Sequence, residues 1–216
     1  MFPVAPEGRL FVIGTAWLAV VTLLFGYTEP GAFLVTLAIA LMLVFRKFQR
    51  PVPARALGVV APTDGVVRSV EEARDPFSGG RAWRIVIRQR ALGEYNLYVP
   101  QEGTVVHRFW PGKETGGDAD PQLKDRLGLA FQTDEGPFFS LALDLGHWPR
   151  FIRVAATTGN RLGRAKGLGF AGFGGTVVLW LPHGASVSVR PGQRVLGGSD
   201  LLGDLPAPAP PEEGGE

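Results

Sequence analysis

The stretch FAGFGGTVVLWLP, Phe170 to Pro182, decides the fold, because a glycine-rich approach leads there into an apolar strand. Gly172, Gly174 and Gly175 allow the backbone to take positive φ or to approach another backbone closely. Residues Thr176 to Leu181 are mostly β-branched or large and apolar, which predicts a strand. No Lys or Ser follows the glycines, so the segment does not match a phosphate-binding loop. By itself the pattern is typical of a glycine-rich bulge that enters a core strand.

The chain after residue 59 contains many short segments rich in β-branched and aromatic residues, separated by Gly, Pro and Asp turns. No segment there has the periodicity of a helix of any length. The spacing therefore predicts a mainly β domain, built as a sandwich or a barrel. The predicted strands are Val66 to Val70, Trp83 to Arg88, Thr104 to Phe109, Phe138 to Leu145, Phe151 to Ala156, Thr176 to Leu181 and Ser186 to Val189.

Two apolar runs precede this domain, Leu10 to Tyr27 and Ala32 to Phe45, with the break TEPG between them. As helices they would reach about 27 Å and about 21 Å, against a hydrocarbon core of roughly 30 Å. Backbone groups in lipid must be satisfied internally, which favours helices over strands. The pattern predicts a transmembrane helical hairpin over residues 1–45. A signal peptide and a buried hairpin of a soluble protein are the alternatives.

Basic residues follow the second run, at Arg46, Lys47, Arg50 and Arg55, with no acid among them. By the positive-inside rule, this bias places the β domain on the cytoplasmic side of the cell membrane. Each base near an anionic leaflet can also add about 1 kcal/mol of attraction. The bases either hold the domain on lipid or only set the topology, and the sequence leaves both open.

Composition narrows the function classes. The 216 residues are 45% hydrophobic and carry a formal net charge of +2, with no cysteine. No disulfide framework or thiolate metal site is therefore available. The arginines are scattered through predicted strands and form no basic stripe, so no nucleic-acid partner is expected.

The chain divides into four parts: the hairpin at 1–45, a basic juxtamembrane linker at 46–58, the β domain at 59–203 and a disordered tail at 204–216. Within the domain, Pro111 to Arg126 is rich in Gly, Asp and Lys and predicts a loose loop. Asp118 and Asp120 in that loop lack the spacing and terminal Glu of a calcium loop, so no metal is predicted.

Three stretches together resemble the phosphatidylserine decarboxylase family, especially its short bacterial membrane-anchored form. They are APTDGVV at Ala61 to Val67, the run from Tyr95 to Gly112, and the glycine-rich segment. The stretch FRKFQRPVP is also similar to the family's FFRDP-x-R-x-x-P junction, although it lacks the acid of that motif. The resemblance covers nearly the whole chain. It implies a lipoyl-like barrel-sandwich hybrid domain, a link to phospholipid metabolism and a pyruvoyl cofactor made from an internal serine.

The resemblance also implies the site residues. Asp64 matches the aspartate of the family's SPADGKV motif, which helps to activate the self-cleaving serine through a histidine. Counting back from Pro100 and Gly103 in the family's VHxxRxPxxG pattern places the histidine position at Tyr95, and the position three residues later at Tyr98. Tyrosine has a pKa near 10 and is a poor base at neutral pH, so the family's base is substituted.

The nucleophile is substituted as well. The family's FGST or LGST tetrad reads Phe173, Gly174, Gly175 and Thr176 here, so the family's cleavage site falls between Gly174 and Gly175 and the serine position is glycine. A pyruvoyl group needs a side-chain oxygen that accepts the acyl group and then leaves, which glycine does not have. Thr176 is one residue displaced and would give a different oxoacyl group, and Ser199 in LGGSD falls at a later turn. No pyruvoyl cofactor is therefore expected.

These observations favour a catalytically inactive homologue that binds phospholipid or regulates an active relative. Its expected partners are membrane phospholipids of the anionic kind, a second copy of itself or an active homologue. The residues expected to face lipid are Arg46, Lys47, Arg50, Phe173 and Thr176. Two alternatives stay open: an active phosphatidylserine decarboxylase that matures by an unusual route, and a membrane-tethered lipoyl-like adaptor for another complex.

Overall fold

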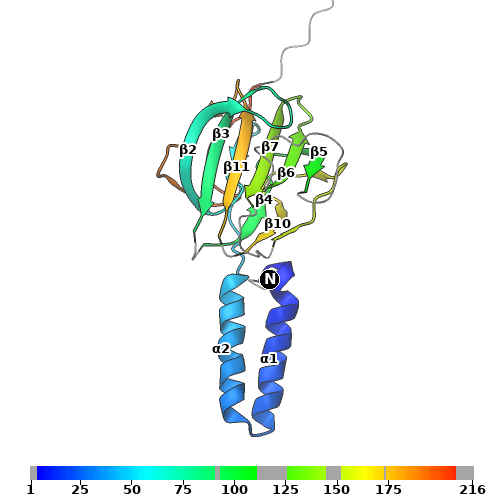
Figure 1. Ribbon diagram of the computed structural model, residues 1–216, viewed down its shortest axis with the longest axis vertical. Helices are drawn as coiled ribbons and strands as arrows, with labels where there is room; N and C mark the ends of the chain where they lie inside the picture. The colour runs from blue at the N-terminus through cyan, green and yellow to red at the C-terminus, as the bar shows by residue number, and fades with distance from the viewer. Residues whose placement is uncertain (1–3, 91–92, 111–125, 145–151, 173, 208–216) are drawn as a thin grey trace, which may run out of the picture.

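A computed structural model describes residues 4–90, 93–110, 126–144, 152–172 and 174–207. A pair of helices projects from one end of a β domain, as Figure 1 shows. After a short 3-10 turn, η1 (Pro6–Gly8), helix α1 (Arg9–Leu24) runs away from the β domain and α2 (Thr28–Val44) returns to it. The two helices pack side by side along their length.

The turn between the helices lies earlier than the sequence break. Gly26 takes a left-handed φ of 82° in this turn, and the residues of the break form the first turn of α2. Pro30 fits there because the first backbone N–H groups of a helix have no intrahelical partner. At Gly31 a Cβ would lie 2.4 Å from Leu23 Cδ2, so glycine permits the close helix contact.

The outer surface of the helix pair is apolar. Leu10, Trp17 and Phe33 are 84%, 67% and 67% exposed, respectively. The segment Pro6–Leu24 is long and apolar enough to cross a membrane, whereas Thr28–Val44 is apolar but shorter. An exposed apolar surface of this extent is typical of a segment that contacts lipid or another protein.

The β domain contains one eight-stranded sheet and two three-stranded sheets, all paired antiparallel in the described residues. The large sheet has the order β13-β2-β3-β11-β7-β6-β5-β9, and the small sheets have the orders β1-β14-β12 and β4-β10-β8. The strands are β1 (Gly58–Val60), β2 (Gly65–Arg74), β3 (Arg81–Gln89), β4 (Asn96–Tyr98), β5 (Gly103–Phe109), β6 (Arg126–Gln132), β7 (Phe138–Asp144), β8 (Ile152–Val154), β9 (Arg161–Leu162), β10 (Gly167–Ala171), β11 (Thr176–Pro182), β12 (Ser186–Val187), β13 (Arg194–Val195) and β14 (Leu201–Asp204).

Strand β11 is central because both of its faces are buried. It lies between β3 and β7. Val177, Leu179 and Leu181 enter the main core, while Val178 and Trp180 belong to a smaller cluster. A strand covered on both faces reads as a continuous apolar run, which explains the stretch TVVLWLP.

The mainly β prediction is confirmed. Each of the seven predicted segments contains a strand, although Leu145 and Phe151 lie outside the described residues. The pattern missed seven further strands, each of which is short or contains glycine: β1, β4, β6, β9, β10, β13 and β14. At the edges of the predicted loose regions, Arg126 begins β6, and Asp204 ends β14 and is followed by the buried Leu205. Residues 111–125 and 208–216, the larger part of both regions, lie outside the described residues.

An apolar cluster joins the helix pair to the β domain. Phe45 at the end of α2 stacks on Phe170 of β10 with ring centroids 4.9 Å apart, and Tyr95 meets the same ring edge-on. The Ala5 N–H donates to the Phe45 carbonyl at 2.7 Å. Both chain segments at this end of the helices are therefore fixed to the domain and to each other.

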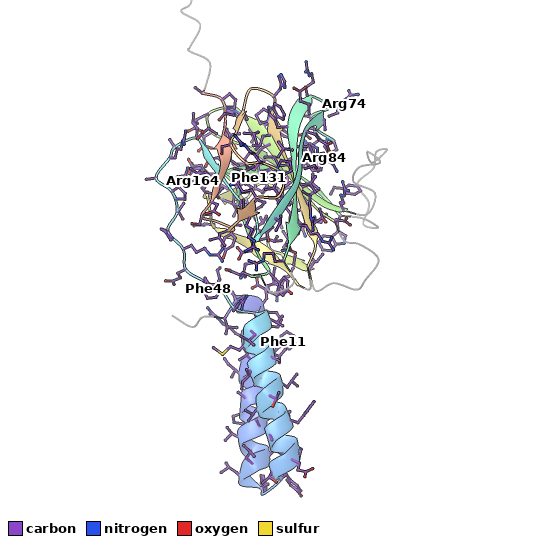
Figure 2. The ribbon with its side chains drawn as sticks, turned by 90° about the vertical axis from the view of Figure 1, so that its left-hand side faces the viewer. Phe11, Phe48, Arg74, Arg84, Phe131 and Arg164 are labelled. Atoms are coloured by element: carbon purple, nitrogen blue, oxygen red, sulfur yellow. The ribbon has the colours of Figure 1, made fainter. Side chains whose placement is uncertain are left out.

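Arg164 fastens the linker that follows. Its guanidinium donates to the carbonyl oxygens of Pro53, Arg55, Ala56 and Gly58. Figure 2 shows Arg164 on the side of the domain along which the linker runs. One side chain thus satisfies backbone acceptors of the linker and of the first residue of β1.

We expect Arg164→Ala to lower the free energy of unfolding by about 2 kcal/mol, because charged donors to several carbonyls are lost. The linker should also open locally, so limited trypsin treatment should cleave faster after Arg55. Arg161→Ala is the matched control, since the Arg161 ion pair with Asp134 is exposed. Equal stability and equal cleavage in the two variants would contradict this role.

Candidate functional site

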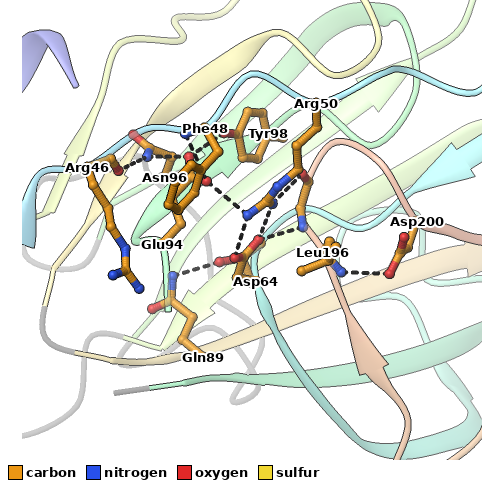
Figure 3. A network of polar contacts seen from close by, with 12 residues as sticks. Arg46, Phe48, Arg50, Asp64, Gln89, Glu94, Asn96, Tyr98, Leu196 and Asp200 are labelled. Atoms are coloured by element: carbon orange, nitrogen blue, oxygen red, sulfur yellow. Dashed lines mark hydrogen bonds and ion pairs between the residues drawn. The ribbon is translucent and has the colours of Figure 1, made fainter. Parts of the chain in front are cut away.

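The carboxylate of Asp64 lies in the turn between β1 and β2 and is fully engaged. Arg50 Nη1 and Nη2 donate to its two oxygens at 2.5 and 2.8 Å, and the Gly197 N–H donates at 2.8 Å. Arg50 Nη1 also donates to the Gly197 carbonyl at 3.0 Å. Figure 3 shows this bidentate pair at the centre of a polar network. Asp64 is thus bound by a guanidinium from the linker.

A second carboxylate, Glu94, lies on the other side of the same guanidinium. Arg50 Nη2 is 3.1 Å from Glu94 Oε2, and the Glu94 side chain is fully buried. Its other oxygen accepts hydrogen bonds from Tyr98 Oη at 2.5 Å and from Asn96 Nδ2 at 2.6 Å. Burying a carboxylate is tolerated only when it is paired and hydrogen-bonded, and Glu94 meets both conditions.

The two tyrosines that the resemblance assigns to the family's base positions separate in space. Tyr98 joins the Asp64 network through Glu94 (Figure 3), whereas Tyr95 packs in the apolar cluster with Phe45 and Phe170. Burial, followed by the hydrogen bond to Glu94, raises the pKa of Tyr98 far above its ordinary value. Burial also raises the pKa of Tyr95. Both stay protonated at neutral pH, so neither hydroxyl acts as a base there.

Gln89 connects the Asp64 turn to the glycine-rich segment. Its N–H donates to the Gly175 carbonyl at 2.8 Å, and its Nε2 donates to Thr63 Oγ1 at 2.8 Å. Gln89 also pairs with Gly65 in the register of β2 and β3. Gln89, at the end of β3, thus contacts both neighbours of Asp64 and the backbone of Gly175, so the two positions that the resemblance assigns to one site lie close together.

The glycine-rich segment does not fit a pyruvoyl group. Gly174 has a left-handed φ of 75°, which explains a glycine there, but Gly175 has no side-chain oxygen or β-carbon from which the group could form. Thr176 pairs with Arg88 as the first residue of β11. Phe173 lies outside the described residues.

The bases expected to face lipid differ in their surroundings. Arg50 is occupied by the two carboxylates and is not a free surface charge. The Arg46 guanidinium lies 5.6 Å from the Phe48 ring centroid, and Lys47 Nζ lies 5.9 Å from that of Tyr98. No ion pair or hydrogen bond between described residues joins Thr176 to these bases.

Comparison with known proteins identifies the family. A family model described as phosphatidylserine decarboxylase matches residues 37–203. The phosphatidylserine decarboxylase proenzyme of Symbiobacterium thermophilum is 35% identical over 207 residues, which cover 94% of this chain and 96% of the relative. The proenzyme of Geobacter metallireducens is 31% identical over 212 residues, with 94% and 97% covered. The chain belongs to the phosphatidylserine decarboxylase family. No solved structure matches it.

Sequence reasoning found Asp64 and the glycine-rich segment but missed Glu94, Asn96 and Gln89. Nothing in the local sequence marks Glu94 as a buried carboxylate, because its partners come from the linker and β4. A sequence feature that could have pointed to this carboxylate is Arg50, whose neighbours in the linker are mostly apolar or basic. In the described residues, Asp64 is bound by Arg50 and the Gly197 N–H, no histidine contacts it, and Gly175 carries no side-chain nucleophile.

We expect Arg50→Gln to lower the free energy of unfolding by about 3 kcal/mol, because it leaves two buried carboxylates without their counter-ion. Denaturant unfolding of the purified chain measures this loss. Adding Glu94→Gln should recover part of it, since one of the two charges is then removed. Arg81→Gln, which breaks an exposed pair with Glu72, is the control and should change stability little. If Arg50→Gln lowers the free energy of unfolding no more than the control does, the ion pairs of Arg50 with Asp64 and Glu94 do not stabilise the fold, and this role is refuted.

Proposed function

We propose that this chain is a catalytically inactive member of the phosphatidylserine decarboxylase family that binds phospholipid at the cytoplasmic face of the cell membrane. Two features together support the proposal: glycine stands at the position assigned to the serine, Gly175, and the carboxylate of Asp64 is held in an ion pair by Arg50. A second copy of the chain or an active relative is the partner that such a regulatory homologue would bind. The two small sheets packed on a large one support the lipoyl-like barrel-sandwich hybrid of the family.

The chemistry of the reaction explains why these substitutions matter. Decarboxylation leaves a carbanion, and the carbonyl cofactor supplies the electron sink that accepts it. Formation of that cofactor needs a hydroxyl nucleophile and a base that takes its proton. In this chain the nucleophile position has no side chain, and Tyr98 donates its proton to Glu94 and accepts none.

The mature protein should be one uncleaved chain of 23.2 kDa. Intact mass spectrometry of the protein purified from membranes reads this directly. Two fragments divided at Gly174 and Gly175, or a blocked oxoacyl terminus, would overturn the inactive assignment. Release of carbon dioxide from phosphatidylserine by the purified chain would overturn it independently.

Restoring the lost groups tests the assignment of positions. Gly175→Ser alone should cleave slowly or not at all, because the nucleophile has no base. Adding Tyr98→His should increase cleavage more than adding Tyr95→His, since only Tyr98 shares a network with Asp64. Nucleophile and base act as a unit, so the effects should be strongly non-additive. Greater cleavage with Tyr95→His would show that Tyr95, and not Tyr98, occupies the position of the family's histidine.

The exposed apolar surface of the helix pair supports integral membrane attachment, and the bases after Phe45 support a cytoplasmic β domain. The chain should therefore stay in the membrane fraction after high-salt and carbonate washes and be released only by detergent. Attachment by basic residues alone would be salt-sensitive. Release by either wash would contradict the anchor, and protection of a C-terminal tag from external protease in inside-out vesicles would contradict the orientation.

A further inference from the structure

A pocket of about 350 Å³ opens beside the linker, next to the Asp64 network, with Arg50 in its wall and neither Asp64 nor Glu94 among the residues that line it. None of the glycine-rich residues 174–176 lines it. Its volume is near the lower end of the range for small-molecule sites, about 300–1,000 Å³, which suits a head group and excludes a pair of acyl chains. Residues that line the pocket include Lys47, Phe48, Arg50, Val52, Tyr98 and Gly198.

The pocket presents one uncompensated positive charge. Lys47 is half-buried, and its ammonium has no hydrogen bond or ion pair to any residue that the structure describes. It is held over the Tyr98 ring and beside Gly167, where a Cβ would lie 3.2 Å from Nζ. A partly desolvated ammonium without an anionic partner attracts an anion, and the aromatic ring restricts where that anion sits.

The negative charges near the pocket are not available to a ligand. Asp64 and Glu94 both face Arg50, and their remaining lone pairs accept hydrogen bonds from Gly197, Asn96 and Tyr98. A ligand ammonium group would therefore find no free carboxylate and would meet Lys47 as a like charge. The pocket favours an anionic group that has no amine beside it.

The position of the pocket indicates where this anion comes from. Lys47 follows the end of α2 by three residues, and Figure 2 shows Phe48 at the level where the helix pair meets the β domain. Phe48 and Val52 on the pocket rim are 51% and 47% exposed. Apolar rim side chains at this depth would enter the boundary between head groups and acyl chains. Ala165 on the pocket wall has a φ of 57°, a strained value for a non-glycine residue that is enriched at ligand sites.

We propose that this pocket binds the phosphate of an anionic phospholipid without an amine, such as phosphatidylglycerol, through Lys47. The inference rests on the proposed lipid-binding function and narrows it to a head-group class and a place. Phosphatidylserine carries the same net charge as phosphatidylglycerol, so a preference between the two cannot arise from surface potential alone.

The experiment uses the full chain in mild non-ionic detergent micelles that contain equal mole fractions of phosphatidylglycerol, phosphatidylserine or phosphatidylcholine. Native mass spectrometry counts the lipids that remain bound. We expect one phosphatidylglycerol per chain, with binding about tenfold stronger than for phosphatidylserine, a ratio within reach of one charge-assisted contact. Lys47→Gln should abolish this preference. Arg46→Gln, which removes the same charge from a neighbour that does not line the pocket, should retain it.

A second variant keeps the charge and changes only the side chain that carries it. Lys47→Arg leaves a cation at the same position of the pocket, so it should retain phosphatidylglycerol where Lys47→Gln loses it. The proposed pocket site would be overturned if the two anionic lipids bound equally, or if Lys47→Gln and Arg46→Gln lost equal amounts of bound phosphatidylglycerol. Either result would indicate general attraction to the protein surface. Competition by millimolar inorganic phosphate or glycerol phosphate as strong as that by the lipid would assign the site to a free phosphate and overturn the lipid source.

Failure of this proposal is distinguishable from failure of the proposed function. The mass of the mature chain and the release of carbon dioxide decide whether the protein is an enzyme, whatever lipid it retains. An uncleaved chain that binds phosphatidylserine as well as phosphatidylglycerol would keep the inactive assignment and overturn only the head-group class. A cleaved chain with a Lys47-dependent preference would overturn the inactive assignment and leave the pocket intact.

Discussion

The guanidinium of Arg50 between two buried carboxylates is the interaction on which the site depends. Asp64 comes from the turn before β2, Glu94 precedes β4, and Arg50 comes from the linker after α2. Three segments far apart in sequence are thereby held in one place. Because each carboxylate would be costly without the cation, the linker cannot leave the domain surface without exposing or protonating them. The same pairing removes Asp64 from any role as a free acceptor.

Much of the fold could be predicted from sequence because its signals are local. The two apolar runs and the β-rich pattern after residue 59 predicted the helix pair and most long strands. Among the strands that were missed, β4 and β10 pair with each other, and β10 also pairs with β8. Their short length and their glycines give no alternation to read, and their existence depends on tertiary contacts. The helix boundary at Thr28 was displaced because Pro30 is tolerated in a first turn.

The site was only partly predictable, for a physical reason. The spacing of short motifs was enough to select Asp64, Tyr98 and Gly175 as candidate site residues, because motif matching needs only the order of residues along the chain. Glu94 and Gln89, which interact with these residues or their neighbours, could not be selected in this way. Their contacts depend on how β3 and β4 pack against the linker and the glycine-rich segment. Counting along the sequence also treated Tyr95 and Tyr98 alike, whereas one packs against Phe170 and the other donates a hydrogen bond to Glu94. Sequence position did not reveal which tyrosine lies near Asp64.

The stacked contact of Phe45 on Phe170, together with the Ala5 to Phe45 backbone bond, leaves no free hinge between the helix pair and the β domain. If the helix pair spans a bilayer, as proposed, a domain held in this way would stay at a fixed height above it. A lipid would then reach the Lys47 pocket by lateral diffusion within one leaflet, a search in two dimensions. Its local concentration would be set by mole fraction in that leaflet, so a modest intrinsic affinity would suffice for high occupancy. Changes in leaflet composition would be read directly as changes in how many chains carry a lipid.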